Sequence, residues 1–145
     1  MISPAVIASL VFGACGLLAA AAVEYILRTV ADEAGINRWI FVAVPGLFAM
    51  LFAMVLYQDA RRKIKRLGES ISRGILIALL TWISFSLLAT WAWCPPHQIG
   101  QCFGHTLLAA AIVGGGPMLA AALVAGVLTG VLIIRPPPRK PVVDQ

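Results

Sequence analysis

Residues 103–134 read FGHTLLAAAIVGGGPMLAAALVAGVLTGVLII, a run of 32 residues without one formal charge. Three further apolar runs precede it, at residues 4–23, 39–57 and 74–93. Each run approaches or exceeds the ~20 residues that a helix needs to cross a ~30 Å hydrocarbon core. Because a chain in lipid must satisfy its own backbone hydrogen bonds, runs of this length form helices. The sequence therefore predicts an all-α, polytopic integral membrane protein with four transmembrane helices in a bundle.

Composition supports this class. Hydrophobic residues make up 61% of the chain and charged residues 12%, whereas a soluble domain is roughly 25% charged. The alternating segments of about ten residues that mark an outer-membrane barrel are absent from the sequence. We expect residues 1–145 to form a single transmembrane domain, with helices at about 4–27, 39–57, 74–93 and 103–134.

Positive charge is concentrated in two segments, residues 58–73 and 135–145. They hold nine of the eleven Lys and Arg residues, whereas the connection 94–101 has no formal charge. Cytoplasmic loops of membrane proteins carry an excess of Lys and Arg. We therefore expect a multi-pass protein of the inner, cytoplasmic membrane with both termini in the cytoplasm. The nine residues are Arg61, Arg62, Lys63, Lys65, Arg66, Arg73, Arg135, Arg139 and Lys140.

The basic loop 58–73 also carries an apolar pattern, with Gly68 expected to interrupt the helix. Such a segment can lie on the bilayer and direct its cations toward anionic headgroups, each worth up to ~1 kcal/mol. The alternative is that these charges only set topology. Nucleic acid is not expected as a partner, because a soluble fold and interleaved aromatic residues are lacking. The cations in question are Arg61, Arg62, Lys63, Lys65 and Arg66.

Two apolar runs contain helix-breaking residues. The last run spans about 48 Å if it is fully helical at ~1.5 Å per residue, which exceeds the hydrocarbon core and requires tilt, protrusion or a break. A break is expected at Gly114, Gly115, Gly116 and Pro117, and a kink at Pro45. Discontinuous helices bind substrates or ions in transporters. The competing interpretation is a kink that serves packing alone.

Small residues recur every fourth position in the last run, at Ala122, Gly126 and Gly130. Such a stripe lets another helix approach closely, and we expect it to contact a partner subunit or a second copy. Ser9 and Gly13 form a weaker version of the same stripe in the first helix.

Two polar features flank the helices. Glu24 and Arg28 are spaced for an i,i+4 ion pair at the outer end of the first helix, although Glu24 could instead be an intramembrane carboxylate on an ion path. Tyr57 at the end of the second run is expected to be an interfacial anchor. Hydroxyl groups in the third run face a partner helix or bond to their own helix. They belong to Thr81, Ser84, Ser86 and Thr90.

The outer loop holds Cys94 and Cys102, with His97 between them and His105 shortly after. The predicted topology places this loop on the exported face, where an oxidising compartment favours a disulfide between the two cysteines. The alternative is a zinc site made by the two thiolates and the two imidazoles. Cys15 is interpreted as a small buried residue.

Catalytic signatures are missing from the sequence. It has no Gly-rich phosphate loop, nucleophile elbow or His-x-x-Glu-His segment. We therefore expect no enzyme and no cofactor. The expected function is that of a self-associating or accessory subunit of a larger membrane assembly, with the lipid bilayer and other membrane subunits as partners. An oligomeric channel or small transporter is the alternative, and a redox or metal-handling protein is a weaker one.

Overall fold

A computed structural model describes residues 3–31, 38–58 and 66–133 of the chain. These residues form four long α-helices and one short 3-10 helix, which confirms the expected all-α fold. The elements are α1 (Pro4–Ala31), α2 (Arg38–Leu56), α4 (Leu67–Trp93), η1 (Pro96–Gln98) and α5 (Ile99–Ile133).

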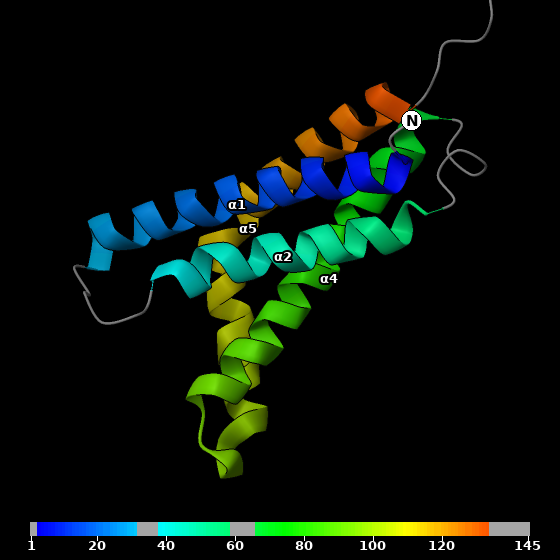
Figure 1. Ribbon diagram of the computed structural model, residues 1–145. Helices are drawn as coiled ribbons and strands as arrows, with labels where there is room; N and C mark the ends of the chain where they lie inside the picture. The colour runs from blue at the N-terminus through cyan, green and yellow to red at the C-terminus, as the bar shows by residue number, and fades with distance from the viewer. Residues whose placement is uncertain (1–2, 32–37, 59–65, 134–145) are drawn as a thin grey trace, which may run out of the picture.

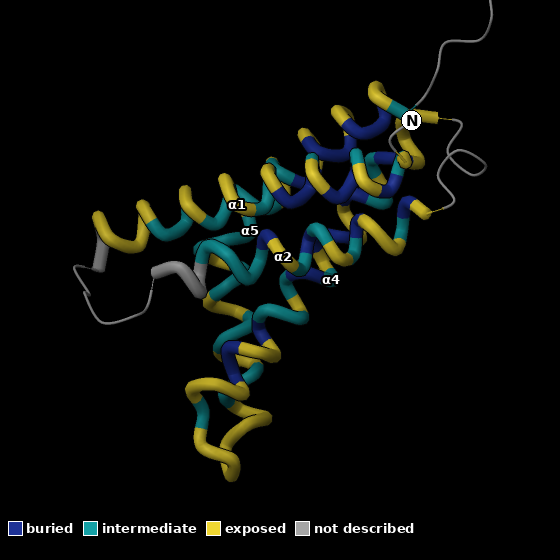
Figure 2. Tube along the Cα trace, in the orientation of Figure 1, coloured by how far each residue is buried: buried dark blue, intermediate teal, exposed yellow. Residues whose placement is uncertain are grey.

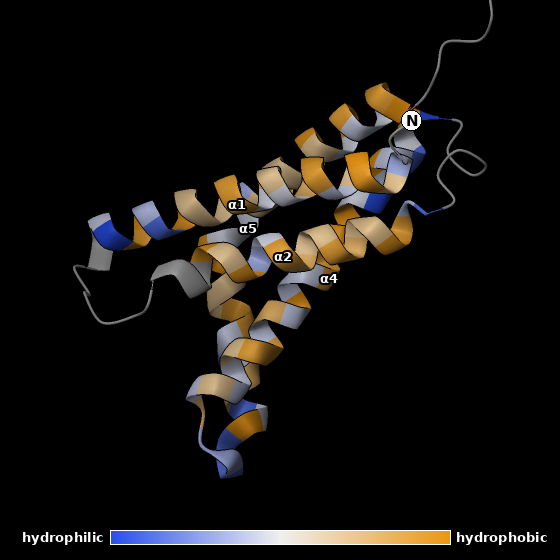
Figure 3. Ribbon diagram, viewed as in Figure 1, coloured by the Kyte–Doolittle hydropathy of each residue, from blue (hydrophilic) through white to orange (hydrophobic). Residues whose placement is uncertain are grey.

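Three apolar stretches are long enough to cross a membrane, namely Pro4–Thr29, Leu67–Trp93 and Pro96–Ile133. The apolar part of α2, Val42–Leu56, is shorter, but the whole helix has 19 residues, or about 28 Å, close to the thickness of the hydrocarbon core. Figure 3 shows hydrophobic residues along all four helices and hydrophilic residues mainly near their ends. The described part of the chain therefore has the composition of a membrane-embedded protein.

The third helix begins earlier than expected. It starts at Leu67 rather than at residue 74, so the second half of the predicted loop 58–73 is helical and Gly68 lies within the first turn. The Arg66 N–H donates a hydrogen bond to the carboxylate of Glu69 at 3.4 Å. This bond satisfies one backbone donor at the helix start, where helices lack internal acceptors. α5 likewise begins at Ile99, before the expected residue 103.

The helices form two antiparallel hairpins, α1 with α2 and α4 with α5. α1 packs against α2 and α5, while α4 packs against α5 and α2. Figure 1 shows that the two hairpins meet at the end where the N-terminus lies and diverge toward the other end. The molecule is therefore closely packed at one end and open at the other.

Most of the buried residues lie at the packed end, which we call the closed end (residues 5–13, 46–57, 67–81 and 122–133). Among the described side chains of α1, those that are buried all fall in its first third, and the buried residues of α5 all fall in its last third. Figure 2 shows this concentration, with a smaller buried patch further along α4. The diverging part of the α4–α5 hairpin, residues 83–113, is called the arm.

α5 changes direction along its length, between its yellow first half and its orange second half in Figure 1. The helix is nevertheless continuous through Gly114 and Pro117, so the expected break takes the form of a bend. The second half of α5 packs against both neighbouring helices, since a Cβ on Gly74 would lie 2.7 Å from the Ala122 carbonyl oxygen and 3.3 Å from Phe12. The bend therefore lets the second half of α5 pack against α1, while both halves of α5 pack against α4.

Candidate functional site

A buried hydrogen-bond network joins three helices at the closed end. The Tyr57 side chain is fully buried directly after α2, and its hydroxyl lies 2.9 Å from the Ser70 Oγ and 3.1 Å from the Ser70 carbonyl oxygen. Ser70 Oγ donates to the Gly126 carbonyl oxygen at 2.8 Å. The end of α2, the start of α4 and the last third of α5 are therefore fixed to one another. The expectation that Tyr57 is an interfacial anchor is wrong, because α1 and α4 cover its ring.

Arg73 completes this network from α4. Its Nη1 donates to the Leu56 carbonyl oxygen at 2.6 Å, and its guanidinium lies 5.7 Å from the centre of the Tyr57 ring. A cation at a helix C-terminus satisfies exposed carbonyl groups and interacts favourably with the helix dipole. From the sequence, Arg73 was interpreted only as one of the charges that set topology. Its separation from the basic cluster was the sign, missed at that point, that it has a different role.

The small-residue stripe on α5 receives α4 of the same chain. A Cβ added to Gly126 would lie 3.1 Å from the Ile71 Cα, and one added to Gly130 would lie 2.6 Å from Leu67 Cδ1. The Ala122 carbonyl oxygen faces Gly74 in the same contact. The stripe therefore does allow a close helix approach, but the approaching helix belongs to this chain. The contact predicted for a partner subunit is occupied.

The weaker stripe on α1 also serves an internal contact. Ser9 Oγ donates to the Met50 carbonyl oxygen at 3.1 Å, and a Cβ on Gly13 would overlap the Met50 side chain. On α2, a Cβ on Gly46, next to Pro45, would lie 2.7 Å from the side chain of Leu17. Small residues therefore allow close helix contact in both hairpins, α1–α2 and α4–α5.

The glycines at the α5 bend differ from those at the helix contacts. A Cβ on Gly115 or Gly116 would meet nothing within 4 Å, and one on Gly114 would be 4.0 Å from the nearest atom, in Val23. Close packing therefore does not require glycine at these three positions. Their effect is on the backbone, together with Pro117, which cannot donate to the preceding turn.

Two buried hydroxyls on α4 lie near the level of this bend. Thr81 Oγ1 and Ser86 Oγ are buried and have no hydrogen-bond partner within the described structure. The antiparallel register is set by Ser70 with Gly126 and by Cys94 with Cys102. In this register, Thr81 lies at the level of Gly115. Ser84 on the same helix is half-buried.

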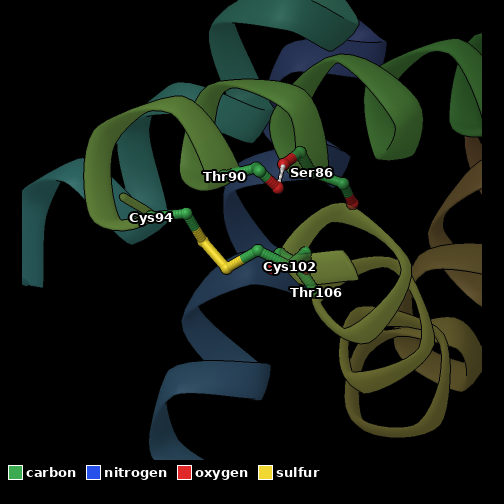
Figure 4. The surroundings of a disulfide bond; sticks show 5 residues. All are labelled: Ser86, Thr90, Cys94, Cys102 and Thr106. Atoms are coloured by element: carbon green, nitrogen blue, oxygen red, sulfur yellow. Dashed lines mark hydrogen bonds between the residues drawn. A yellow bond between two sulfur atoms is a disulfide. The ribbon is translucent and has the colours of Figure 1, made fainter. Parts of the chain in front are cut away.

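The two outer cysteines form the predicted disulfide. Cys94 and Cys102 have their Cα atoms 6.4 Å apart, within the usual range for a disulfide. Figure 4 shows the bond joining the end of α4 to the start of α5, with the Ser86 hydroxyl directed toward α5. Thr90 Oγ1 donates to the Ser86 carbonyl oxygen at 2.7 Å, and Thr106 Oγ1 donates to the Cys102 carbonyl oxygen at 2.9 Å. The hydroxyls of Thr90 and Thr106 therefore bond to carbonyl groups of their own helices, close to the disulfide.

The alternative zinc site loses its thiolate ligands. Both sulfur atoms are engaged in the disulfide, and a metal binds the thiolate form of cysteine. The imidazoles of His97 and His105 are exposed on the arm. No group of three or more metal-ligating side chains occurs among the residues that the structure describes. Cys15 is a free, half-buried cysteine that packs against the core.

The charged residues divide between described and undescribed parts of the chain. Arg28 and Glu24 form the expected i,i+4 ion pair at 2.9 Å. Arg66 is exposed at the start of α4. The remaining cations of the basic cluster, and the whole tail 135–145, lie outside the described residues. The undescribed members of the cluster are Arg61, Arg62, Lys63 and Lys65.

No protein-family model, no curated protein and no solved structure matches this chain. A proposal for its function must therefore be argued from the geometry of its own helices. The features available are the closed end, the bend with its hydroxyls, and the open surfaces of α5 and the arm.

Proposed function

We propose that this chain is a small inner-membrane protein that works through helix contacts, as a self-associating or accessory subunit of a larger membrane assembly. It acts without catalysis and without a cofactor. In this proposal both termini face the cytoplasm, because the two basic segments of the sequence follow the second and the last apolar runs and cytoplasmic loops carry an excess of Lys and Arg. The four apolar helices support membrane insertion.

The open surface of α5 is the observation that carries this proposal. Five of the 35 residues of α5 are buried inside the molecule, and all five lie in its last third. Gly116 and Ala120 lie one turn apart on the exposed face of this helix, and a Cβ on Gly116 would meet nothing within 4 Å. In membranes, helices associate through pairs of small residues at this spacing. We therefore assign the contact with a neighbouring subunit to this face, in place of the internally occupied stripe at Ala122, Gly126 and Gly130.

The test replaces both small residues by a bulky one, Gly116→Ile with Ala120→Ile. The protein is purified in mild detergent, its mass is measured by light scattering, and co-purifying proteins are identified by mass spectrometry. We expect the wild type to run as an assembly and the double variant to run as a monomer, with the far-UV circular dichroism spectrum unchanged. The matched control is Ala14→Ile with Ala21→Ile, two exposed positions on α1. Normal assembly of the α5 double variant would refute the proposal.

A channel or small transporter is the second candidate, and the unpartnered hydroxyls favour it. Thr81 and Ser86 place two buried oxygen atoms without a hydrogen-bond partner in the described structure near the α5 bend. Bent or interrupted helices with free polar groups line the solute sites of transporters. Liposomes that contain only this protein would show solute flux, and Thr81→Val with Ser86→Ala would abolish that flux. Absence of flux with both sodium and potassium gradients would argue against this candidate.

A further inference from the structure

The arm exposes its apolar side chains outward from the α4–α5 contact. On its inner face, Ser86 and Thr90 are buried. On its outer face, Trp91 is 78% exposed, Leu108 62% and Ile112 83%. Residues 74–134 carry no formal charge at all. A surface of this kind is stable only if something apolar covers it.

The chemistry of the arm is graded along its length. The tip carries the exposed polar side chains of His97 and Gln98, and Figure 3 shows hydrophilic segments there beside one hydrophobic turn. Trp91 and Trp93 come next and are both largely exposed. Further from the tip the exposed side chains are aliphatic, as at Ile112. This order, from polar groups through tryptophan to aliphatic groups, is the order of environments from headgroup to hydrocarbon in a bilayer.

The length of the arm matches one leaflet. The α4 side of the arm is the helical segment 83–93, which extends about 16 Å at ~1.5 Å per residue. Half of a ~30 Å hydrocarbon core is about 15 Å. An α4 segment of this length, set along the bilayer normal, would span one leaflet.

The size of the exposed side chains distinguishes lipid from a protein neighbour. Where helices of this chain meet closely, glycine occupies the contact, as at Gly74 and Gly126. The outward positions of the arm are instead occupied by large residues such as Trp91 and Ile112. Close protein contacts in membranes are enriched in small residues, whereas lipid chains accommodate large ones. We propose that lipid of the exported leaflet covers the arm, and that Trp91 and Trp93 set its depth at the headgroup boundary.

The experiment measures the depth of single tryptophans in vesicles. Full-length protein is reconstituted into phosphatidylcholine whose acyl chains carry bromine either near the carbonyl end or near the methyl end. One variant keeps Trp91 alone, with Trp39, Trp82 and Trp93 replaced by phenylalanine. A second variant has all four tryptophans replaced by phenylalanine and carries Ile112→Trp. We expect the shallow bromine to quench Trp91 about twofold more than the deep one, and the order to reverse in the Ile112→Trp variant.

A third variant that keeps only Trp82, which is half-buried with its indole nitrogen inside the bundle, is the control for a protein-covered ring. It should be quenched less than Trp91 by both lipids. If Trp91 and the Ile112→Trp variant resist both lipids and aqueous iodide, protein covers the arm and the proposal is overturned. Strong quenching by iodide in the Ile112→Trp variant would place the arm in water and would also overturn it.

Ile112 lies one turn before Gly116 on the exposed face of α5, so a subunit bound at Gly116 and Ala120 could also shield residue 112. Protection of the Ile112→Trp variant that is lost when Gly116→Ile and Ala120→Ile are added would report that subunit contact, whereas protection that persists would overturn the lipid proposal.

Discussion

The closed end and the arm are made from the same two helices, yet they are stabilised differently. At the closed end, glycine contacts and the bonds from Ser70 hold α4 against α5, α2 and α1. Along the arm, α4 packs against α5, and the disulfide between Cys94 and Cys102 closes the tip. Lipid is as apolar as a leucine side chain, so apolarity alone does not choose a helix partner. Small residues and buried polar bonds make that choice in this chain.

Gly74→Leu gives the largest expected effect, because it attacks the closed end directly. A Cβ at this position would lie 2.7 Å from the Ala122 carbonyl oxygen, a backbone atom that cannot move aside independently. We expect a loss of about 3 kcal/mol or more, at the upper end of overpacking costs. The measurement is the free energy of unfolding in mixed micelles titrated with dodecyl sulfate.

Gly104→Leu is the matched control on the arm. A Cβ on Gly104 would meet nothing within 4 Å, and Gly104 lies inside α5, so the same substitution there should not destabilise the protein and should raise stability by about 0.5–1 kcal/mol through helix propensity. Equal losses in the two variants would show that the closed end and the arm do not differ in packing.

The double variant Cys94→Ser with Cys102→Ser tests how far the disulfide stabilises the arm. Loss of a disulfide across this short loop, with a sequence separation of 8, should cost about 2–3 kcal/mol by loop-closure entropy. The loss should be local, because the disulfide joins the end of α4 to the start of α5, whereas most buried residues lie at the closed end. Hydrogen exchange followed by mass spectrometry should show faster exchange in residues 94–106 and unchanged exchange in 67–81. Equal acceleration in both segments would contradict an independent arm.

Ser70→Ala should cost about 1–2 kcal/mol. The variant loses the bond to the Gly126 carbonyl oxygen and the contact with the Tyr57 hydroxyl, both fully buried. Ser72→Ala is the control, since Ser72 is exposed and bonds only to the Glu69 carbonyl oxygen of its own turn, at 3.0 Å. Unfolding in mixed micelles should separate the two variants clearly. A Ser70→Ala variant as stable as Ser72→Ala would mean that the network contributes nothing to the closed end.

Features encoded by local spacing could be predicted from the sequence. The four apolar runs gave four helices, and the cysteine spacing with the charge distribution gave the disulfide between Cys94 and Cys102. The ion pair of Glu24 and Arg28 followed from their one-turn separation. Each of these features depends on residues that are close in the sequence and on the environment in which they lie, namely the membrane or the exported compartment.

Features that depend on which helix meets which could not be predicted. The periodicity of Gly126 and Gly130 identifies a contact face but does not say whether the partner is α4 or another molecule. An aromatic residue at the end of an apolar run resembles an interfacial anchor, so the burial of Tyr57 was not evident. The early start of α4 was hidden because its first turn, with Glu69, lies among basic residues.

Gly115→Ala gives the smallest expected effect and tests what the glycines at the bend do. A Cβ there would meet nothing within 4 Å, and the residue lies within a continuous helix. Alanine should therefore raise stability by about 0.5–1 kcal/mol through helix propensity. Gly126→Ala, whose Cβ would lie 3.1 Å from the Ile71 Cα, should lower it in the same micelle titration. If Gly115→Ala also destabilises the protein, glycine is needed for the change of direction itself, and the arm then owes its divergence to the backbone at residue 115 rather than to Pro117 alone.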